Sequence, residues 1–255
     1  MMIFWTIFSI IFASGNNVSR ETMNGEIYME FDFKPFFERY EALVRQVDTL
    51  FQQIDQEHPG CVRCRAACSD CCHAVFDLTL IEALYINRRF YEAFRGKERE
   101  AILDKANQAD RQVYKFKRGA FKALRSGEKT EDRILSEMAE KRIRCPLLND
   151  HAMCDLYGFR PITCRLYGIP TAIGGKGHTC GISGFKEGTA YPTINLDAIH
   201  RRLIEISKDL VVALKSKYGR MGEMLVPLSM ALLNQYDERY LGVAEDDTDT
   251  NTAKE

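Results

Sequence analysis

The sequence lacks a strong net charge, an internal repeat and an apolar run long enough to cross a membrane. Its 35 Lys and Arg residues offset 36 Asp and Glu residues, and the net charge of -1 gives no general reason to expect a nucleic-acid partner. The apolar segment at residues 2–13 is shorter than the roughly 20 residues that a spanning helix needs, so we expect no stable membrane span. No run of alternating apolar and polar residues predicts a sheet.

Cysteine is absent from most of the chain, because all nine cysteines fall in two windows. Scattered buried thiols would not cluster in this way, and an odd count with two adjacent cysteines fits a secreted disulfide framework poorly. A site of reduced thiolates favours a cytoplasmic location. The first window contains Cys61, Cys64, Cys68, Cys71 and Cys72, and the second contains Cys145, Cys154, Cys164 and Cys180.

Signatures of other chemistry are also missing. The glycine-rich stretch 168–177 fails as a phosphate-binding loop, because Pro170 stands at the position of the first glycine and Gly177 replaces the Ser or Thr that would hold magnesium. We interpret this stretch as a flexible loop around a metal site. A redox-active dithiol usually lies at a strand–helix junction, and no βαβ pattern is visible. No nucleophile–base pair or carboxylate pair stands out, so catalysis stays open.

The chain divides into three segments. Residues 1–28 are an apolar N-terminal segment that lacks the positive start of a signal peptide, so either a signal or anchor, or a true start at Met23 or Met29, remains open. Residues 29–241 are expected to form a helical metal-binding domain. Residues 242–255 are acidic and rich in threonine, and we expect them to be disordered.

Helical periodicity dominates outside the cysteine windows. Apolar residues from Phe33 to Ile54 recur at intervals of three and four, and Pro35 suits a first helical turn. The segment Thr79-Leu80-Ile81-Glu82 has the form of a capping box and predicts a helix to about Arg95. The expected fold class is therefore mainly α, with helices around a cysteine-rich, loop-built metal-binding centre. A long helix is expected over Glu98–Arg125, and after a break at Ser126-Gly127 a shorter helix is expected to end at about Ile143. Two more helices are expected, one from the N-cap Asn195 through Leu214 and one over Gly222–Tyr240.

Two surface features bear on partners. The apolar stripe of Phe33–Ile54 either packs on the rest of the chain or forms a homodimer contact. Residues 86–129 hold more than twice as many Lys and Arg as Asp and Glu, which indicates a solvated basic helix or a surface for an acidic partner. A protein partner or substrate therefore stays open, whereas nucleic acid is not expected.

The first cysteine window has the spacing of a metal site. It reads C-x2-C-x3-C-x2-C-C from Cys61 to Cys72. A C-x-x-C step lets two thiolates from one tight turn reach one metal ion or cluster, which is why it recurs at zinc and iron–sulfur sites. The second window is spaced more widely, and we expect it to complete the same site or a neighbouring one.

The second window carries the more specific motif. It contains Cys145-Pro146-Leu147 and then Cys154-Asp155-Leu156-Tyr157-x2-Arg160-Pro161-x2-Cys164-Arg165. With the run that closes in Cys71-Cys72, this motif resembles the CxxCxxCC cysteine-cluster (YkgJ-like) family over about residues 61–184. That family is described as zinc- or iron-chelating and is similar to the flagellin lysine N-methylases. Its first run is more compact, because here Cys64 and Cys68 are separated by three residues and Cys61 is added.

The resemblance implies a metal-binding function with a defined set of ligand candidates. Cys61 and Cys64 join this set from their spacing, whereas the other positions are carried over by the resemblance. His73, His151 and His178 each lie within three residues of a cysteine and could replace a thiolate, but ordinary loop histidines explain them as well. The carried-over candidates are Cys68, Cys71, Cys72, Cys145, Cys154, Cys164 and Cys180.

The sequence favours iron over zinc on two grounds. Adjacent cysteines suit one tetrahedral zinc poorly but can serve an iron–sulfur cluster and its neighbour. Arg144, Arg160 and Arg165 could also offset the negative charge of a cluster held by four thiolates. We therefore expect an iron–sulfur cluster of the [4Fe–4S] type, with zinc as the alternative.

Three functions follow from such a centre. The first is a metal-binding protein whose cluster is structural, redox-active or sensory. The second is a protein-modifying, lysine N-methylase-like enzyme that uses the cluster and S-adenosylmethionine. Cys64-x3-Cys68-x2-Cys71 matches the spacing of radical enzymes, although the barrel strand that usually precedes it is missing. The third is a metal carrier or assembly factor.

Overall fold

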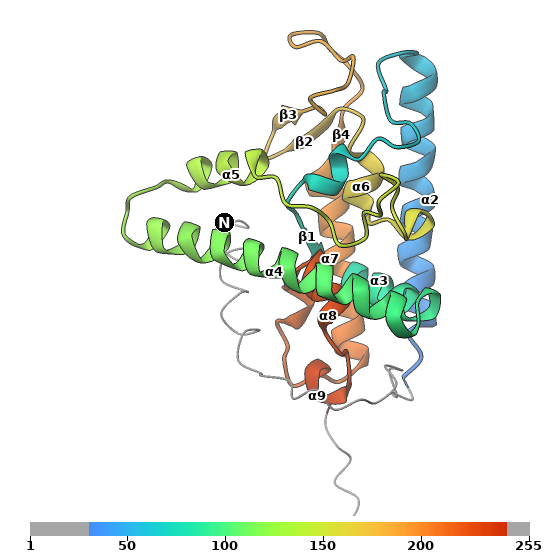
Figure 1. The fold of residues 1–255 in the computed structure, drawn as a ribbon, viewed down its shortest axis with the longest axis vertical. Coiled ribbons are helices and arrows are strands. Elements are labelled where there is room, and N and C mark those ends of the chain that lie inside the picture. The colour runs from blue at the N-terminus through green and yellow to red at the C-terminus, as the bar shows by residue number, and fades with distance from the viewer. Residues whose placement is uncertain (1–30, 244–255) are drawn as a thin grey trace, which may run out of the picture.

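The computed structural model describes residues 31–243, and the prediction of a mainly helical chain is confirmed there (Figure 1). The expectations for residues 1–28 and for the acidic tail beyond Val243 lie outside the described residues. Among residues 31–243, none of the helices has the length and apolarity to cross a membrane.

The helices and strands alternate along the chain without forming a large sheet. The helices are α2 (Lys34–Glu57), α3 (Leu80–Ala93), α4 (Gly96–Arg125), α5 (Glu131–Glu140), α6 (Ile162–Leu166), α7 (Leu196–Ala213), α8 (Leu228–Leu233) and α9 (Glu238–Leu241). Short 3-10 helices are η1 (Asp70–His73), η2 (Tyr157–Phe159) and η3 (Met221–Glu223). The strands are β1 (Asp77–Thr79), β2 (Thr171–Ile173), β3 (Lys176–His178), β4 (Ile194–Asn195) and β5 (Leu225–Pro227).

The long helices begin where the sequence signals them. Pro35 lies in the first turn of α2. The capping box of α3 is formed, because the Glu82 carboxylate accepts hydrogen bonds from the Thr79 backbone N–H at 3.1 Å and from the Thr79 hydroxyl at 2.9 Å. The Asn195 side chain accepts from the Ala198 N–H at 3.0 Å and caps α7. Local chemistry therefore fixes the starts of these helices.

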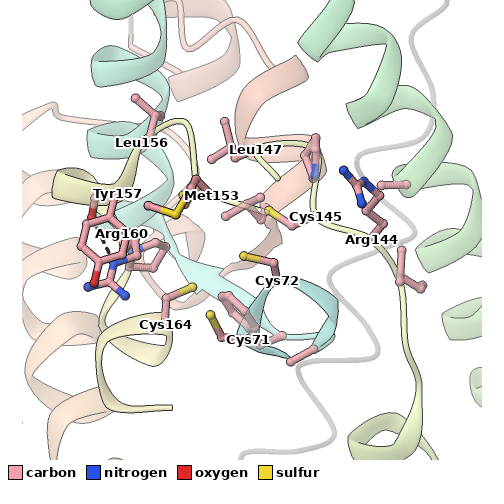
Figure 2. A pocket seen from close by; sticks show the side chains of 18 of the residues that line it. Cys71, Cys72, Arg144, Cys145, Leu147, Met153, Leu156, Tyr157, Arg160 and Cys164 are labelled. Atoms are coloured by element: carbon pink, nitrogen blue, oxygen red, sulfur yellow. Dashed lines mark hydrogen bonds between the residues drawn. The ribbon is translucent and has the colours of Figure 1, made fainter. Parts of the chain in front are cut away.

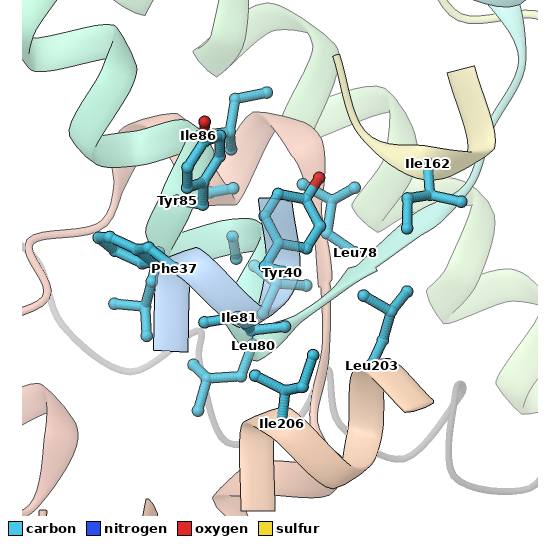
Figure 3. Packing of buried hydrophobic residues seen from close by; sticks show 14 of the residues in the cluster. Phe37, Tyr40, Leu78, Leu80, Ile81, Tyr85, Ile86, Ile162, Leu203 and Ile206 are labelled. Carbon is cyan, nitrogen blue, oxygen red and sulfur yellow. The ribbon is translucent and has the colours of Figure 1, made fainter. Parts of the chain in front are cut away.

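The main core lies around α3, which is buried on all sides from Leu80 to Asn87. Figure 3 shows Tyr40 of α2 and Ile206 of α7 packed around Leu80 and Ile81 of α3. Each fully buried Leu or Ile side chain stabilises the fold by about 1.5–3 kcal/mol. Because α3 follows the first cysteine window through β1, this core anchors the window.

The single helix expected over Gly222–Tyr240 is wrong. Residues Leu225–Pro227 form β5 and pair antiparallel with β1, with Thr79 opposite Leu225. Pro227 has no N–H for an interior helical bond and disfavours a helical conformation at the preceding Val226. The chain therefore forms η3, β5, α8 and α9 in place of one helix.

The glycine-rich stretch after Gly168 is a β-hairpin, not the flexible loop that we expected. Strands β2 and β3 pair antiparallel, with Thr171 opposite His178, and β4 adds to β2 in parallel. The turn is Gly174-Gly175, with φ of 57° and 76°, as a type I′ turn requires. Strands of two or three residues are too short for an alternating pattern to reveal them, so this sheet could not be predicted from the sequence.

The helix expected to continue to about Ile143 stops at Glu140, and the chain then runs back along the first window. Figure 1 shows the second half of α4 and all of α5 extending away from the other helices. Ala120 and Ile134 form a small cluster there, separate from the main core. The tip of the α4–α5 hairpin therefore projects from the body, whereas Lys117 of α4 still pairs with the buried Asp77 of β1 at 2.6 Å.

Candidate metal centre

Six of the nine cysteines line one cavity of about 230 Å³. They come from three segments of the chain, namely the first window, the loop after α5, and α6. Figure 2 shows the sulfur atoms of Cys71, Cys72, Cys145 and Cys164 pointing into a shared space. The six cavity cysteines are Cys68, Cys71, Cys72, Cys145, Cys154 and Cys164.

The two cysteine windows are joined through their backbones. The Cys145 N–H donates to the Cys72 carbonyl at 2.7 Å, and the Ile143 N–H donates to the His73 carbonyl at 3.0 Å. The short helix η1 ends at His73, and β1 follows within four residues. The pair of windows thus forms one unit that is attached to the core through β1.

A tight loop brings Cys145 and Cys154 to the same side of the cavity. The Asn149 side-chain oxygen accepts from the Met153 N–H at 3.0 Å, and its amide nitrogen donates to Asp155 at 2.8 Å. The Asp155 N–H donates to the Leu147 carbonyl at 2.8 Å. These bonds close the loop without a regular strand.

Helix α6 carries Cys164 and is fixed to the body on two sides. The buried Glu82 carboxylate accepts from the Ile162 N–H at 3.2 Å, which ties the start of α6 to the capping box of α3. Arg165 donates to both oxygens of Asp48 on α2, at 3.0 and 2.7 Å. Cys164 is therefore held at a defined position between the core and the cavity.

The arginines of the second window have different roles. Arg165 is committed to Asp48, and Arg144 donates to the carbonyls of Leu148 and Asn149. Arg160 lines the cavity, and its guanidinium lies 3.7 Å from the centroid of the Tyr157 ring. Burial raises the pKa values of Cys154 and Cys164, and a hydrogen bond from Cys72 lowers that of Cys71, while the charge of Arg160 favours the thiolate form of all three. Arg160 is thus the arginine best placed to offset negative charge on these thiols.

The thiols differ in their protonation. A hydrogen bond from the Cys72 thiol lowers the pKa of Cys71 to about 7, and the same bond raises the pKa of Cys72. Burial raises the pKa of Cys145 to about 12 and raises the pKa values of Cys154 and Cys164. In the metal-free protein these three thiols keep their protons at neutral pH, so metal binding must release protons.

Cys61, Cys64 and Cys180 do not line this cavity. The Cys180 thiol lies 3.5 Å from Oδ2 of Asp70, and the other carboxylate oxygen, Oδ1, accepts a hydrogen bond from Arg142. Cys64 packs against Gly168, where any Cβ would overlap its sulfur atom. The Cys61 carbonyl accepts from the Gly184 N–H at 2.7 Å. These three cysteines stay ligand candidates, but they lie outside the group of six.

The described residues contain no ready-made site for a metal ion. Among residues 31–243, no group of three or more His, Cys, Asp or Glu side chains has the arrangement of such a site. The chemistry of the lining is nevertheless that of a thiolate site, because cysteine sulfur binds both zinc and iron–sulfur clusters.

Several residues at the site were not predicted from the sequence. The histidine candidates His73, His151 and His178 do not line the cavity, whereas Met153 does and also accepts at its sulfur from the Ala67 N–H. The cavity also has apolar lining residues, which include Ile86 and Val113. No spacing rule links these positions to the cysteines, because three different helices and a strand bring them together. The remaining apolar lining includes Phe76, Ala109, Pro227 and Leu228.

Comparisons of the chain with models of protein families, with curated proteins and with solved structures found no match. The motif around Cys154, Arg160 and Cys164 and the geometry of the cavity are therefore the grounds on which a function can be argued.

Proposed function

We propose that the protein binds an iron–sulfur cluster, of the [4Fe–4S] type, in the cavity between its two cysteine windows. The observation that carries this proposal is the convergence of six thiols from three separate segments on one cavity. A cluster of this type takes four thiolates, so the cavity offers enough ligands. The resemblance of the motif to a family of metal-chelating proteins points the same way.

Four of the six thiols are the strongest ligand candidates. Cys71, Cys145 and Cys154 each raise the pKa of Cys164, so the four lie close enough to interact. Cys68 instead neighbours Cys64 and Cys180, whereas Cys72 also interacts with Cys71, Cys145 and Cys154 and donates a thiol hydrogen bond to Cys71. We assign ligation to Cys71, Cys145, Cys154 and Cys164, with Cys72 as the nearest replacement.

The chain prepares this site in three ways. Arg160 supplies a positive charge that offsets the charge of ligated thiolates. Ile86, Val113 and the other apolar lining residues keep water from one wall of the cavity. Glu82 and Arg165 hold α6, and through it Cys164, in position. When bound, the cluster would supply one-electron redox chemistry.

Two observations weigh between this proposal and its alternatives. The adjacent Cys71 and Cys72 suit one tetrahedral zinc ion poorly, which favours a cluster over a single zinc ion. The radical-enzyme spacing Cys64-x3-Cys68-x2-Cys71 is divided, because Cys68 and Cys71 line the cavity and Cys64 does not. Helix α2 precedes these three cysteines, in place of the barrel strand that usually precedes them in radical enzymes. A metal-binding role therefore ranks above S-adenosylmethionine chemistry and above a role as metal carrier.

The test is anaerobic reconstitution of matched cysteine variants with ferrous iron and sulfide. We expect Cys164→Ser and Cys145→Ser to lose most of the bound iron and sulfide, and Cys61→Ser to retain the wild-type content. Circular dichroism in the far ultraviolet checks that each variant is folded. Equal losses in all three variants, or full retention in Cys164→Ser, would overturn the assignment.

A further inference from the structure

The second half of α4 carries a row of cations on one side. Arg111, Lys115, Arg118, Lys122 and Arg125 follow one another at intervals of four, three, four and three, and no acidic residue occurs between Arg111 and Gly127. At 3.6 residues per turn, these intervals place all five on one side of the helix. The buried side chains of Ala109, Val113 and Ala120 occupy the opposite side. The five residues are called the basic row below.

The basic row is exposed and has no carboxylate partner among the residues that the structure describes. All five side chains are exposed, and none forms an ion pair within residues 31–243. Lys117, on the buried side, instead lies 2.6 Å from both carboxylate oxygens of Asp77. The helix dipole favours cations in the last turn and so explains Lys122 and Arg125, but it does not explain the first three residues of the row.

The basic row begins where the buried side of α4 packs on the body through Val113 and Lys117, and it ends on the part of α4 that projects from the body. Figure 1 shows this half of α4 leaving the other helices before the chain returns through α5. The small cluster around Ala120 and Ile134 holds α5 on the far side of α4 from the row. A partner can therefore reach the row without contact with the thiol cavity.

Acidic residues limit the length of the basic row at both ends. Glu100 and Asp104 lie on the same side of α4 before it, and Glu128, Glu131 and Asp132 follow it. The row spans 14 steps along the helix, or about 21 Å. A nucleic-acid duplex or a membrane surface would extend past both ends and meet these carboxylates. Charge complementarity therefore fits a short anionic segment.

We propose that the basic row is a docking surface for a short acidic segment of a partner protein, with about five carboxylates over about 21 Å. This inference is independent of the proposed metal centre. Each exposed ion pair contributes little to affinity and is screened by salt, so the row gives weak, salt-sensitive binding that further contacts would strengthen.

The test uses a fluorescein-labelled, alanine-based 15-residue peptide with Glu at positions 1, 5, 8, 12 and 15. Its binding is measured by fluorescence anisotropy at low ionic strength. The row variant is R111Q/K115Q/R118Q/K122Q, and glutamine preserves helix propensity at these exposed positions. The control variant R95Q/K97Q/K186Q/R201Q removes the same charge from exposed residues outside the row. We expect the row variant to bind about tenfold more weakly, and the control variant to change binding less than about twofold.

Three outcomes would overturn the proposal. The first is an equal loss of peptide binding in the row variant and the control variant, which would show that net charge, and not the row, causes the binding. The second is wild-type binding no tighter than that of the row variant. The third is tighter binding of a single-stranded oligonucleotide or of phosphatidylserine vesicles than of the peptide. Thermal melting and iron content, measured on the same samples, separate a folding or metal defect from a loss of docking.

Discussion

The helical body and the thiol loops of this protein are stabilised by different means. The body, formed by α2, α3, α7 and α8, buries side chains such as Tyr40, Leu80 and Phe90 with 1% exposure or less. The thiol loops, residues 61–76 and 142–182, contain no regular element longer than the five residues of α6. Their largest shared feature is a cavity lined by thiols. The body has its own apolar core, whereas the loops surround a space that a cofactor would fill.

This difference suggests how folding and metal binding are divided. A core of packed apolar side chains folds without a cofactor, but loops that meet at a metal site gain their stability from the metal. The two regions meet at Glu82, whose carboxylate accepts from the start of α3 and from the start of α6. We therefore expect the body to survive loss of the metal and the loops to loosen. Five predictions test this contrast.

The largest effect should follow removal of the metal. Binding that stabilises only the ordered loops shifts their opening by about 2.7 kcal/mol, or about 100-fold, when the cofactor is present at 100 times its Kd. Hydrogen exchange followed by mass spectrometry should therefore quicken by up to about that factor in residues 61–76 and 142–167 after chelation. Exchange in α3 and α7 should stay unchanged. A uniform increase in the exchange rate across the chain would contradict the proposed difference between a stable body and metal-dependent loops.

A substitution in the core should lower the stability of the body and leave the metal content unchanged. Phe90 on α3 is fully buried, and Phe90→Ala should lower the free energy of unfolding by about 3–5 kcal/mol because it leaves a cavity. Val212→Ala is the control, because Val212 is 76% exposed and its loss should change stability by less than about 0.5 kcal/mol. Chemical denaturation measures both values. Metal content per folded molecule should not change in either variant, and a large change would break the contrast.

The junction between the regions should show a moderate effect. Glu82→Ala removes the acceptor of the Thr79 and Ile162 N–H groups, and leaving buried donors unpaired costs about 1–3 kcal/mol. The loss should appear both in unfolding and in weaker metal retention, because α6 positions Cys164. A loss of stability without any effect on the metal would show that α6 is held by other contacts.

The stability of the fold should depend on pH through the titration of Glu82. Burial raises the pKa of Glu82 above its ordinary value, so its folded-state pKa exceeds its unfolded-state pKa. The stability contributed by its protonated form is present below the unfolded pKa and is lost as pH rises through the folded pKa. Glu82→Gln removes this titration. Denaturation at several pH values should show that wild type loses stability relative to Glu82→Gln as pH rises, and a constant difference would contradict the assignment.

The smallest effect should come from the surface of the body. Arg39 and Asp209 lie 2.7 Å apart, but both side chains are about half exposed. Exposed pairs of this kind contribute about 0.2–1 kcal/mol, and salt screens them. Arg39→Ala should therefore lower the free energy of unfolding by no more than that amount, as measured by denaturation at low and high salt. A larger loss would place this pair among the main contacts between α2 and α7.

The sequence predicts the body better than the centre, because helices follow local rules. Pro35, the Thr79–Glu82 capping box and Asn195 each mark a helix start through residues within one turn. The pairing of β1 with β5 joins segments almost 150 positions apart, and no local pattern encodes it. The helix expected over Gly222–Tyr240 is wrong for the same reason. The apolar spacing there does not reveal the strand that ends at Pro227, because its partner β1 is distant in the sequence.

The cysteines show the same limit. Their clustering and spacing identify all nine as candidates, but spacing cannot say which thiols converge after folding. Cys64 and Cys68 are close in sequence, yet only Cys68 lines the cavity, whereas Cys72 and Cys164 both line it from separate segments. Long-range packing of α6 against Glu82 and Asp48 decides this outcome.

The most direct test of the central claim is chemical analysis of the protein purified without oxygen. Iron, acid-labile sulfide and zinc should be measured on the same sample, together with a visible absorption spectrum. The proposed cluster predicts iron and sulfide in equal amounts, about four of each per chain, and broad visible absorption. Zinc without sulfide, or a metal-free protein whose thiols are paired as disulfides, would contradict it.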